Sequence, residues 1–379
     1  MQTLVTLRLS TLSNRLFWAL LTAALAIRLI LIITSFGSTD ALLTMSWAHL
    51  SERFGIGPAY HVTPNLNHPP LSSLYMVAAD RLGSRVGLEY PDMFRIFQVI
   101  ADIITAAILW RLTRNREAVA FFFASPAAMF LSGFHCNADP TMIALLVAAV
   151  WMHSGVLLGV ASGIKIAPIP LTPFFLIDLT WRRRLTFLLA FGIVLAAIFI
   201  PALITGGPVV LHNVFGYTGS GYEWGFCGIG FLLRNRMWAE LYATAGRYVL
   251  IVALVALFAF FCRYRTPLPA MIGAALMTLN FFSPAFGIQY LVWPLPFFLF
   301  AIPRKLAYAL NIALSIFTFS AYTIWAGEFP WWFADAAHNP HRELVALLAL
   351  PLWLLYGTAI VVALRERAGQ LRTQQLAEG

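Results

Sequence analysis

The stretch LFWALLTAALAIRLILIITS, residues 16–35, contains a single charged side chain, Arg28. A helix needs about 20 predominantly apolar residues to span the hydrocarbon core of a bilayer. The length and composition of this stretch therefore predict a transmembrane helix. Arg8 and Arg15 precede it, and no small-residue cleavage site follows it, so we expect a retained first helix and not a removed signal peptide.

Similar apolar runs continue along the chain and predict an all-α polytopic membrane protein with about 12 transmembrane helices in a single domain, 1–379. The whole chain is 60% hydrophobic and only 11% charged, whereas soluble domains carry about 25% charged residues. So little polar surface cannot cover one soluble core. The further runs lie near 93–111, 117–133, 140–153, 154–164, 167–180, 185–205, 246–262, 267–283, 290–302, 306–326 and 343–364.

Basic residues indicate the orientation of these helices. Lys and Arg accumulate in cytoplasmic loops. Every basic cluster is cytoplasmic if the N-terminus is cytoplasmic and the segment 69–83 does not cross the membrane. We therefore expect 69–83 to lie at the outer surface of the membrane or to enter the membrane only partway. The net charge of +9 is explained by these inner loops, so we expect no nucleic-acid partner. The clusters are Arg111, Arg114 and Arg116; Arg182, Arg183 and Arg184; Arg263 and Arg265; Arg304 and Lys305; and Arg365 and Arg367.

The outer side then holds two long segments, 36–92 and 206–245, and most of the acidic side chains. A site would therefore face away from the cytosol, and we expect a short, frayed helix end at 365–379 on the inner side. The outer acidic residues are Asp40, Glu52, Asp80, Glu89, Asp92, Asp139, Glu223, Glu240, Glu328, Asp335 and Glu343.

Two polar motifs lie in the first outer segment. Asp40, just past the first helix, could act as a general base on a hydroxyl group, or it could cap a helix that starts at Ala41; the two roles are compatible. His68 precedes Pro69 and Pro70, which are typical of a helix start. The imidazole of His68 could bind a phosphate oxygen, or it could be a solvated loop side chain.

Three further motifs lie between the later helices. His135, Asn137 and Asp139 are costly to place beside a membrane without partners, although Asp139 before Pro140 also suits a helix start. Lys165 interrupts an apolar stretch and needs an anionic partner there, unless it snorkels from a helix end.

Gln289 and Tyr290 could hydrogen-bond a headgroup, whereas an interfacial aromatic belt would alone explain Tyr290 and Trp293. The loop 206–245 also carries Tyr217, Tyr222, Glu223, Trp224, Arg234 and Arg236, which suit either a sugar-binding rim or a membrane interface.

The remaining charged and thiol groups give weaker signals. Arg28 could pair with Asp102 across the first two helices. Cys136, Cys227 and Cys262 have no metal-ligand spacing, and a bridge between Cys136 and Cys227 stays open.

In this order, the motifs resemble the GT-C superfamily of integral-membrane glycosyltransferases over about residues 15–300. The matching features are the early acid Asp40; Pro69-Pro70-Leu71; His135-Cys136-Asn137-Ala138-Asp139; Lys165 followed by prolines to Pro173; and Gln289-Tyr290-Leu291-Val292-Trp293-Pro294. Within this superfamily, the motifs most resemble those of transferases that use dolichyl- or polyprenyl-phosphate sugars. The sequence has a single acid at Asp40 in place of an Asp-x-Asp pair, and Gln289 where some relatives carry a histidine.

This resemblance implies an inverting transfer of a hexose from a polyprenyl-phosphate-linked sugar donor to a glycan or glycolipid acceptor, with membrane lipid as the surrounding partner. Asp40 would be the catalytic base. The donor phosphate and sugar would be bound by Lys165, His68, His135, Asn137, Asp139, Gln289 and Tyr290. We expect no metal and no cofactor.

The resemblance leaves the sugar and the acceptor open, with mannose expected first and glucose next. The expected location is a bacterial inner membrane, with the site facing the periplasm and both termini cytoplasmic, although an endoplasmic-reticulum membrane satisfies the same physics. The alternative functions are a flippase or transporter of a lipid-linked sugar and a purely structural membrane subunit.

Overall fold

The protein is an all-α membrane protein whose computed structural model describes residues 12–217, 224–229, 236–333 and 342–378. The described helices of the first half are α1 (Asn14–Thr34), α2 (Thr39–Phe54), α3 (Ile56–Val62), α4 (Pro70–Val86), α5 (Tyr90–Thr113), α6 (Arg116–Phe123), α7 (Pro126–Phe130), η1 (Leu131–His135), α8 (Asp139–Met152), α9 (Gly155–Ile164), η2 (Ile169–Leu171) and α10 (Thr172–Leu176).

The second half continues this helical architecture and adds one short hairpin, in which Glu328 pairs with Phe333. Its described elements are α11 (Trp181–Gly206), α12 (Val209–Phe215), α14 (Arg236–Arg263), α15 (Leu268–Phe282), η3 (Ile288–Val292), η4 (Leu295–Phe297), α16 (Phe298–Ala301), α17 (Arg304–Ser320), η5 (Ala321–Trp325), β1 (Glu328–Phe329), β2 (Trp332–Phe333) and α18 (Arg342–Glu378).

Six described helices are long and apolar enough to cross a membrane, and a bent pair, Arg116–Phe123 with Pro126–His135, makes a seventh candidate. Their outward side chains are strongly apolar: Ile33, Ile193 and Ile204 are 80%, 67% and 78% exposed. Such surfaces require a nonpolar environment. The predicted 12 crossings are not confirmed, because Asp139–Met152, Gly155–Ile164, Leu268–Phe282 and Ile288–Ala301 are shorter than a full span.

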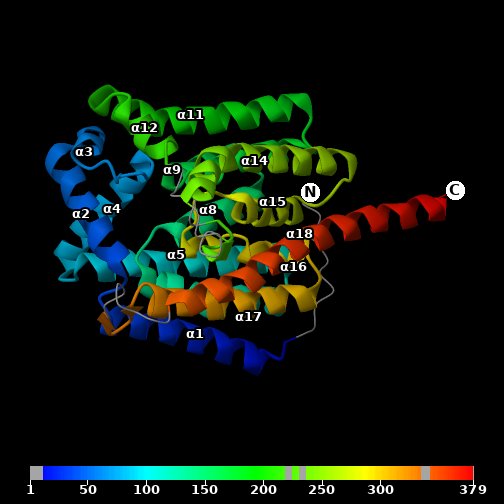
Figure 1. Ribbon diagram of the computed structural model, residues 1–379, viewed down its shortest axis with the longest axis horizontal. Coiled ribbons are helices and arrows are strands. Elements are labelled where there is room, and N and C mark those ends of the chain that lie inside the picture. Colours follow the sequence, from blue (N-terminus) through cyan, green and yellow to red (C-terminus); the bar gives the residue numbers. More distant parts are fainter. Residues whose placement is uncertain (1–11, 218–223, 230–235, 334–341, 379) are drawn as a thin grey trace.

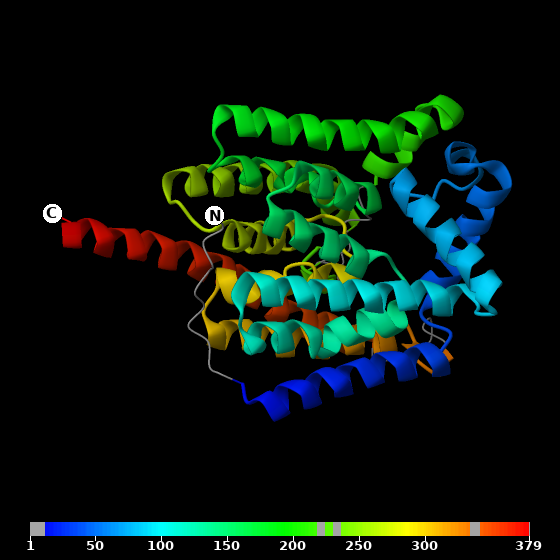
Figure 2. The same ribbon diagram turned by 180° about the vertical axis from the view of Figure 1, so that it is seen from behind.

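The long helices run along one common direction, with α1 and α11 on opposite sides of the bundle (Figures 1 and 2). Helices α2, α3, α4 and α12 gather at one end of this bundle. The start of α11 and the C-terminal end of α18 lie at the other end (Figure 1). The segment 36–92 therefore forms a helical cap on one end of the bundle.

Local sequence determines the shape of this cap. Ser38 caps α2, Gly55 turns the chain into α3 with a φ of 90°, and Pro70 occupies the first turn of α4. The predicted outer helix at 69–83 is thus present as α4, which is not among the candidate spans. Gly57 brings α3 against α11, where a Cβ atom would meet the Thr205 hydroxyl at 2.1 Å.

A buried ion pair joins two long helices inside the bundle. The Arg28 guanidinium is fully buried and donates to Asp102 Oδ2 at 2.8 Å and to Ser132 Oγ at 2.9 Å. This contact confirms the pairing expected between the first two long helices. Because an unpaired charge is expensive at membrane depth, the pair binds α1 to α5 and η1.

Two sequence expectations are changed by the structure, and four of the residues named above lie outside it. The segment 206–245 is not one long loop, since α12 forms within it and α14 begins at Arg236, ten residues before the predicted 246. The C-terminal segment continues the helix α18 to Glu378, because the run 365–378 lacks Pro and Gly apart from Gly369. Tyr222, Glu223, Arg234 and Asp335 lie outside the described residues.

Candidate active site

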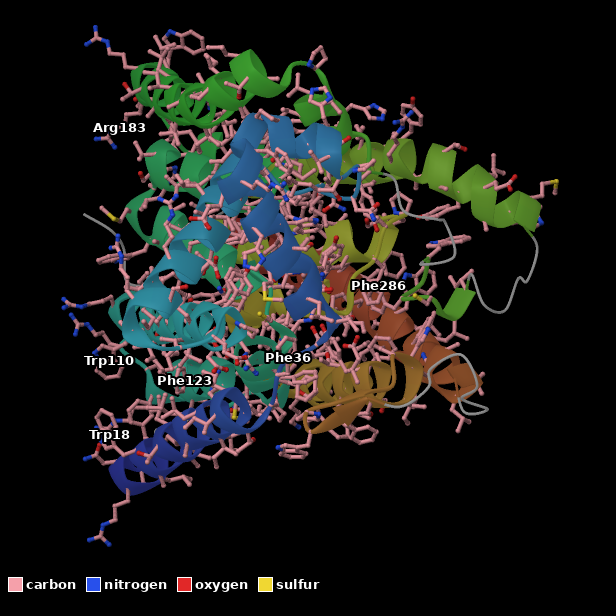
Figure 3. All side chains as sticks on the ribbon, turned by 90° about the vertical axis from the view of Figure 1, so that its left-hand side faces the viewer. Trp18, Phe36, Trp110, Phe123, Arg183 and Phe286 are labelled. Carbon is pink, nitrogen blue, oxygen red and sulfur yellow. The ribbon has the colours of Figure 1, made fainter. Side chains whose placement is uncertain are left out.

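A cavity of about 670 Å³ opens at the capped end of the bundle, bordered by α2, α12 and the loop after α15. Figure 3 looks onto this end and shows Phe286, which lines the cavity, beside the start of α2. Six of the eight predicted site residues line this one cavity: Asp40, His68, Asn137, Lys165, Gln289 and Tyr290. Segments far apart in sequence thus meet at a single site.

Asp40 lies in the first turn of α2 with its side chain 29% exposed. The proposed capping role at Ala41 is wrong, because α2 begins at Thr39 and Ser38 is the cap, its hydroxyl accepting from the Asp40 N–H at 3.3 Å. Asp40 Oδ2 accepts from Asn137 Nδ2 at 2.8 Å. No hydrogen bond from a described residue reaches Asp40 Oδ1, so this oxygen is available to a ligand.

The polar turn after η1 holds Asp40 in this position. Cys136 adopts a left-handed conformation with a φ of 62°, which turns the chain sharply between His135 and Asn137. The Ser38 hydroxyl donates to the His135 carbonyl at 2.5 Å, and the Ser38 N–H donates to the Phe134 carbonyl at 3.3 Å. The start of α2 and the turn are therefore fixed to each other.

Lys165 has its partner within the chain. Its side chain is 9% exposed, and its ammonium group donates to Asp139 Oδ2 at 2.8 Å. This pairing excludes plain snorkelling. Trp293 Nε1 donates to the second oxygen, Asp139 Oδ1, at 2.6 Å. The Lys165 ammonium also lies 5.6 Å from the centre of the Tyr290 ring.

Asp139 was expected to bind the donor phosphate or sugar, but its position in the structure does not fit that role. Its side chain is completely buried, both of its oxygens accept hydrogen bonds from protein groups, and it lines none of the described cavities. It therefore does not contact a ligand in the cavity directly. Its position makes it the residue that orients Lys165.

His68 lies in the loop before α4, where its ring packs 5.1 Å from the centre of the Trp47 ring. Its Nδ1 is 2.9 Å from Asn67 Oδ1, a contact in which the nitrogen carries the proton. Burial, together with the nearby Lys165 charge, lowers the pKa of His68 to about 3. His68 is therefore neutral at physiological pH and acts as a polar group without a charge.

Two smaller cavities continue from the first. One, of about 340 Å³, shares Asp40 and Gln289 with it and is also lined by His135 and Glu328. His135 Nε2 lies 3.3 Å from Asp40 Oδ2. His135, which was also predicted as a site residue, therefore faces Asp40 from this second cavity.

The other continuation, of about 300 Å³, shares His68, Lys165 and Tyr290 with the first cavity. The rest of its wall is largely apolar, as in Phe215 of α12 and Leu250 of α14. A path therefore runs from an apolar groove, past Lys165, to Asp40 and on to Glu328.

Sequence reasoning missed two residues of this site. For Trp293 the sequence leaves open an interfacial aromatic belt or a place in the motif that begins at Gln289, whereas in the structure its indole N–H donates to Asp139 Oδ1. Glu328 accepts hydrogen bonds from the Thr39 N–H at 3.3 Å and from the Thr39 hydroxyl; no local signal indicated this contact, because Glu328 lies in the hairpin after η5. Burial, with the nearby Asp40 charge, raises the pKa of Glu328 despite the Thr39 hydrogen bonds.

The described residues contain no group of three or more His, Cys, Asp or Glu side chains that could hold a metal ion. Cys136 and Cys227 are not joined by a disulfide, so the bridge left open by the sequence is absent.

No family model matches this chain, and no curated protein matches it.

Proposed function

We propose that this protein is an integral-membrane inverting glycosyltransferase that moves a hexose from a polyprenyl-phosphate-linked donor to a hydroxyl group of a glycan or glycolipid acceptor. One observation carries the proposal. A partly exposed carboxylate, Asp40, and a buried ammonium group, Lys165, line one cavity that continues into an apolar groove. These are the groups that a base, a leaving phosphate and a lipid chain require.

Asp40 suits the role of general base. The Asn137 amide holds Oδ2, and the free Oδ1 can accept the proton of the acceptor hydroxyl. The acceptor oxygen then attacks the anomeric carbon, the bond from that carbon to the phosphate oxygen breaks, and the electron pair leaves with the polyprenyl phosphate. The configuration at the anomeric carbon is inverted, because the two oxygens lie on opposite faces.

Lys165 suits the role of phosphate ligand even though it is paired. An ammonium group has three N–H donors, and Asp139 takes one of them. The other two can be directed into the cavity, toward the negative charge that grows on the leaving phosphate. In this proposal Asp139 and Trp293 are positioning residues, and neutral His68, Gln289 and Tyr290 supply further polar contacts from the cavity wall.

The apolar groove suits the polyprenyl chain. It begins at His68, Lys165 and Tyr290 and runs along apolar side chains of α12, α14 and α15. A phosphate held at Lys165 would therefore place its lipid tail between helices and its sugar in the larger cavity beside Asp40.

The membrane arrangement is part of the proposal. Twelve crossings would result if the bent pair, the four shorter apolar helices and the segment 167–180, which contains η2 and α10, each crossed the bilayer. The outer face would be the end capped by α2, α3 and α4 (Figure 1). The basic clusters at the starts of α11 and α17 then lie in the cytoplasm with both termini. We place the protein in a bacterial inner membrane, with a periplasmic site and mannose as the first sugar to test.

The test measures release of polyprenyl phosphate by purified protein in lipid nanodiscs, supplied with polyprenyl-phosphate mannose or glucose and octyl α-D-mannopyranoside as acceptor. Asp40→Asn should lower the rate by about 10²–10⁴-fold and leave the helical content unchanged. Glu89→Gln is the matched control, since Glu89 is an exposed acid just before α5 that lines none of the described cavities.

Retention of more than a tenth of the rate in Asp40→Asn would remove Asp40 from the base role. If no donor released polyprenyl phosphate, the transferase proposal would fail, and passage of the labelled donor across proteoliposomes would identify a transporter instead.

A further inference from the structure

The second cavity, of about 340 Å³, is lined by Asp40 but not by Lys165. It shares Asp40 and Gln289 with the main cavity but has its own wall, formed by α17, η5, β1 and the last residue of η1. Lys165, His68 and Tyr290, which suit the donor, do not line it. The space therefore reaches the base from a separate direction.

Glu328 is the charged group of this wall. It is 5% exposed, and its Oε1 accepts from both the N–H and the hydroxyl of Thr39, the first residue of α2. No hydrogen bond from a described residue reaches its second oxygen, Oε2. Since Glu328 lines the second cavity, Oε2 is the oxygen that remains to accept a hydrogen bond from a ligand.

Tyr322 adds a second unused polar group. The side chain lines the cavity and is 3% exposed, and its hydroxyl has no hydrogen-bond partner among the described residues. Its ring lies 5.1 Å from the His135 ring. An unsatisfied buried hydroxyl costs roughly 1–3 kcal/mol, so a partner from outside the chain would relieve this cost.

The wall also contains a flat aromatic surface, Trp325. A carboxylate oxygen and a tyrosine hydroxyl beside an indole ring match the chemistry of a sugar, whose hydroxyl groups donate and accept hydrogen bonds and whose C–H face packs on aromatic rings. The volume lies near the lower end of the ~300–1,000 Å³ range of small-molecule pockets. It suits the sugar end of a ligand and excludes a bulky one.

We infer that this second cavity binds the hydroxylated acceptor sugar, with Glu328 and Tyr322 holding hydroxyl groups so that one further hydroxyl faces Asp40. The inference rests on the proposed function and deepens it, since it assigns donor and acceptor to two different cavities that share Asp40. Glu328 and Tyr322 then determine acceptor affinity and do not contact the donor.

Two reactions of the same enzyme separate these roles. In transfer, the acceptor hydroxyl attacks the anomeric carbon; in the slow side reaction, water attacks it and gives free hexose and polyprenyl phosphate, with the proton again passing to Asp40. Glu328→Gln keeps an oxygen for Thr39 but loses the charge, and Tyr322→Phe loses only the hydroxyl.

Both variants should raise the KM for octyl α-D-mannopyranoside by about 10-fold or more, as expected when a hydrogen bond to a charged or buried group is lost. The KM for the polyprenyl-phosphate sugar and the hydrolysis rate should stay within about twofold. Glu89→Gln and Tyr248→Phe, both at exposed side chains, are the matched controls.

An unchanged acceptor KM would overturn the inference. An equal fall of transfer and hydrolysis would also overturn it, because it would show that Glu328 acts only on the position of α2. If the wild-type protein released no polyprenyl phosphate, the proposed function would fail separately. Tryptophan fluorescence titration with octyl α-D-mannopyranoside in nanodiscs would then decide the site itself: Glu328-dependent binding supports it, and absence of binding overturns it.

Discussion

Removing the charge of Asp139 tests whether the buried Lys165–Asp139 pair is a structural necessity. Asp139→Asn leaves the Lys165 ammonium, 9% exposed, without its carboxylate at 2.8 Å, and places an amide group between Lys165 and Trp293. Breaking one partner of a buried ion pair costs about 3–5 kcal/mol. We expect a loss of about 3 kcal/mol in the free energy of unfolding, the lower end of this range, because the cavity lets water reach Lys165.

The double variant Asp139→Asn with Lys165→Met removes both charges and should recover the wild-type free energy of unfolding to within about 1 kcal/mol, since paired replacement of a buried ion pair is often neutral. Donor turnover should nevertheless stay lost, because no ammonium remains to bind the phosphate. Recovery of stability without recovery of activity separates the structural role of the charge pair from its proposed functional role.

The assay is reversible unfolding in mixed micelles, followed by helical circular dichroism. Glu52→Gln is the control, because Glu52 pairs with Arg81 at 2.7 Å on an exposed surface, where an ion pair is worth about 0–1 kcal/mol. The reasoning would be refuted if Asp139→Asn cost no more than this control, or if the double variant were as unstable as the single one.

Two other predictions concern residues that line the same cavity as Asp40. Asn137→Ala removes the 2.8 Å hydrogen bond to Asp40 Oδ2 and should lower kcat by roughly 10–100-fold, as expected for a bond to a charged group, with the donor KM unchanged; an unaltered kcat in steady-state assays would contradict it. Burial and the nearby Lys165 charge lower the pKa of His68 to about 3, below its value of about 6.5 in the unfolded chain. The unfolded state therefore binds more protons than the folded state between these two pH values. The free energy of unfolding should fall as the pH drops from 6.5 toward 3. Comparing unfolding curves of the wild type and His68→Gln over this range checks it, and equal pH dependence would show that His68 keeps an ordinary pKa.

Sequence reasoning worked best where one dominant force decides the structure. Burial in hydrocarbon fixes long apolar helices almost independently of their neighbours, and α1 and α11 follow the predicted runs within a few residues. Polar groups in an apolar chain must likewise find partners, which is why six scattered motif residues meet at one cavity.

The sequence could not predict which groups in the site pair with one another. The sequence indicates that Lys165 needs an anionic partner, and Asp40, Asp139 or a ligand phosphate would each fit the motif pattern. In the structure, Asp139 is directed toward Lys165 by two features. One is the turn at Cys136, which separates His135 from Asn137, and the other is the hydrogen bond from the Trp293 indole. Glu328 was equally hidden, because its contact with Thr39 joins the first outer segment to the hairpin after η5. Such choices depend on packing distances between remote segments and leave no local pattern.

The distribution of charge at this site explains how one carboxylate can remain reactive beside a cation. A lysine bonded to the base would favour its ionised form and oppose proton transfer to it. Here the Lys165 ammonium group donates to Asp139, whereas Asp40 Oδ2 accepts from the neutral side-chain amide of Asn137. In the proposed reaction, Asp139 thus fixes the cation where the donor phosphate would bind and leaves Asp40 Oδ1 to the acceptor. Moving the acid, as in Asp40→Glu, should therefore impair transfer even though the charge is kept.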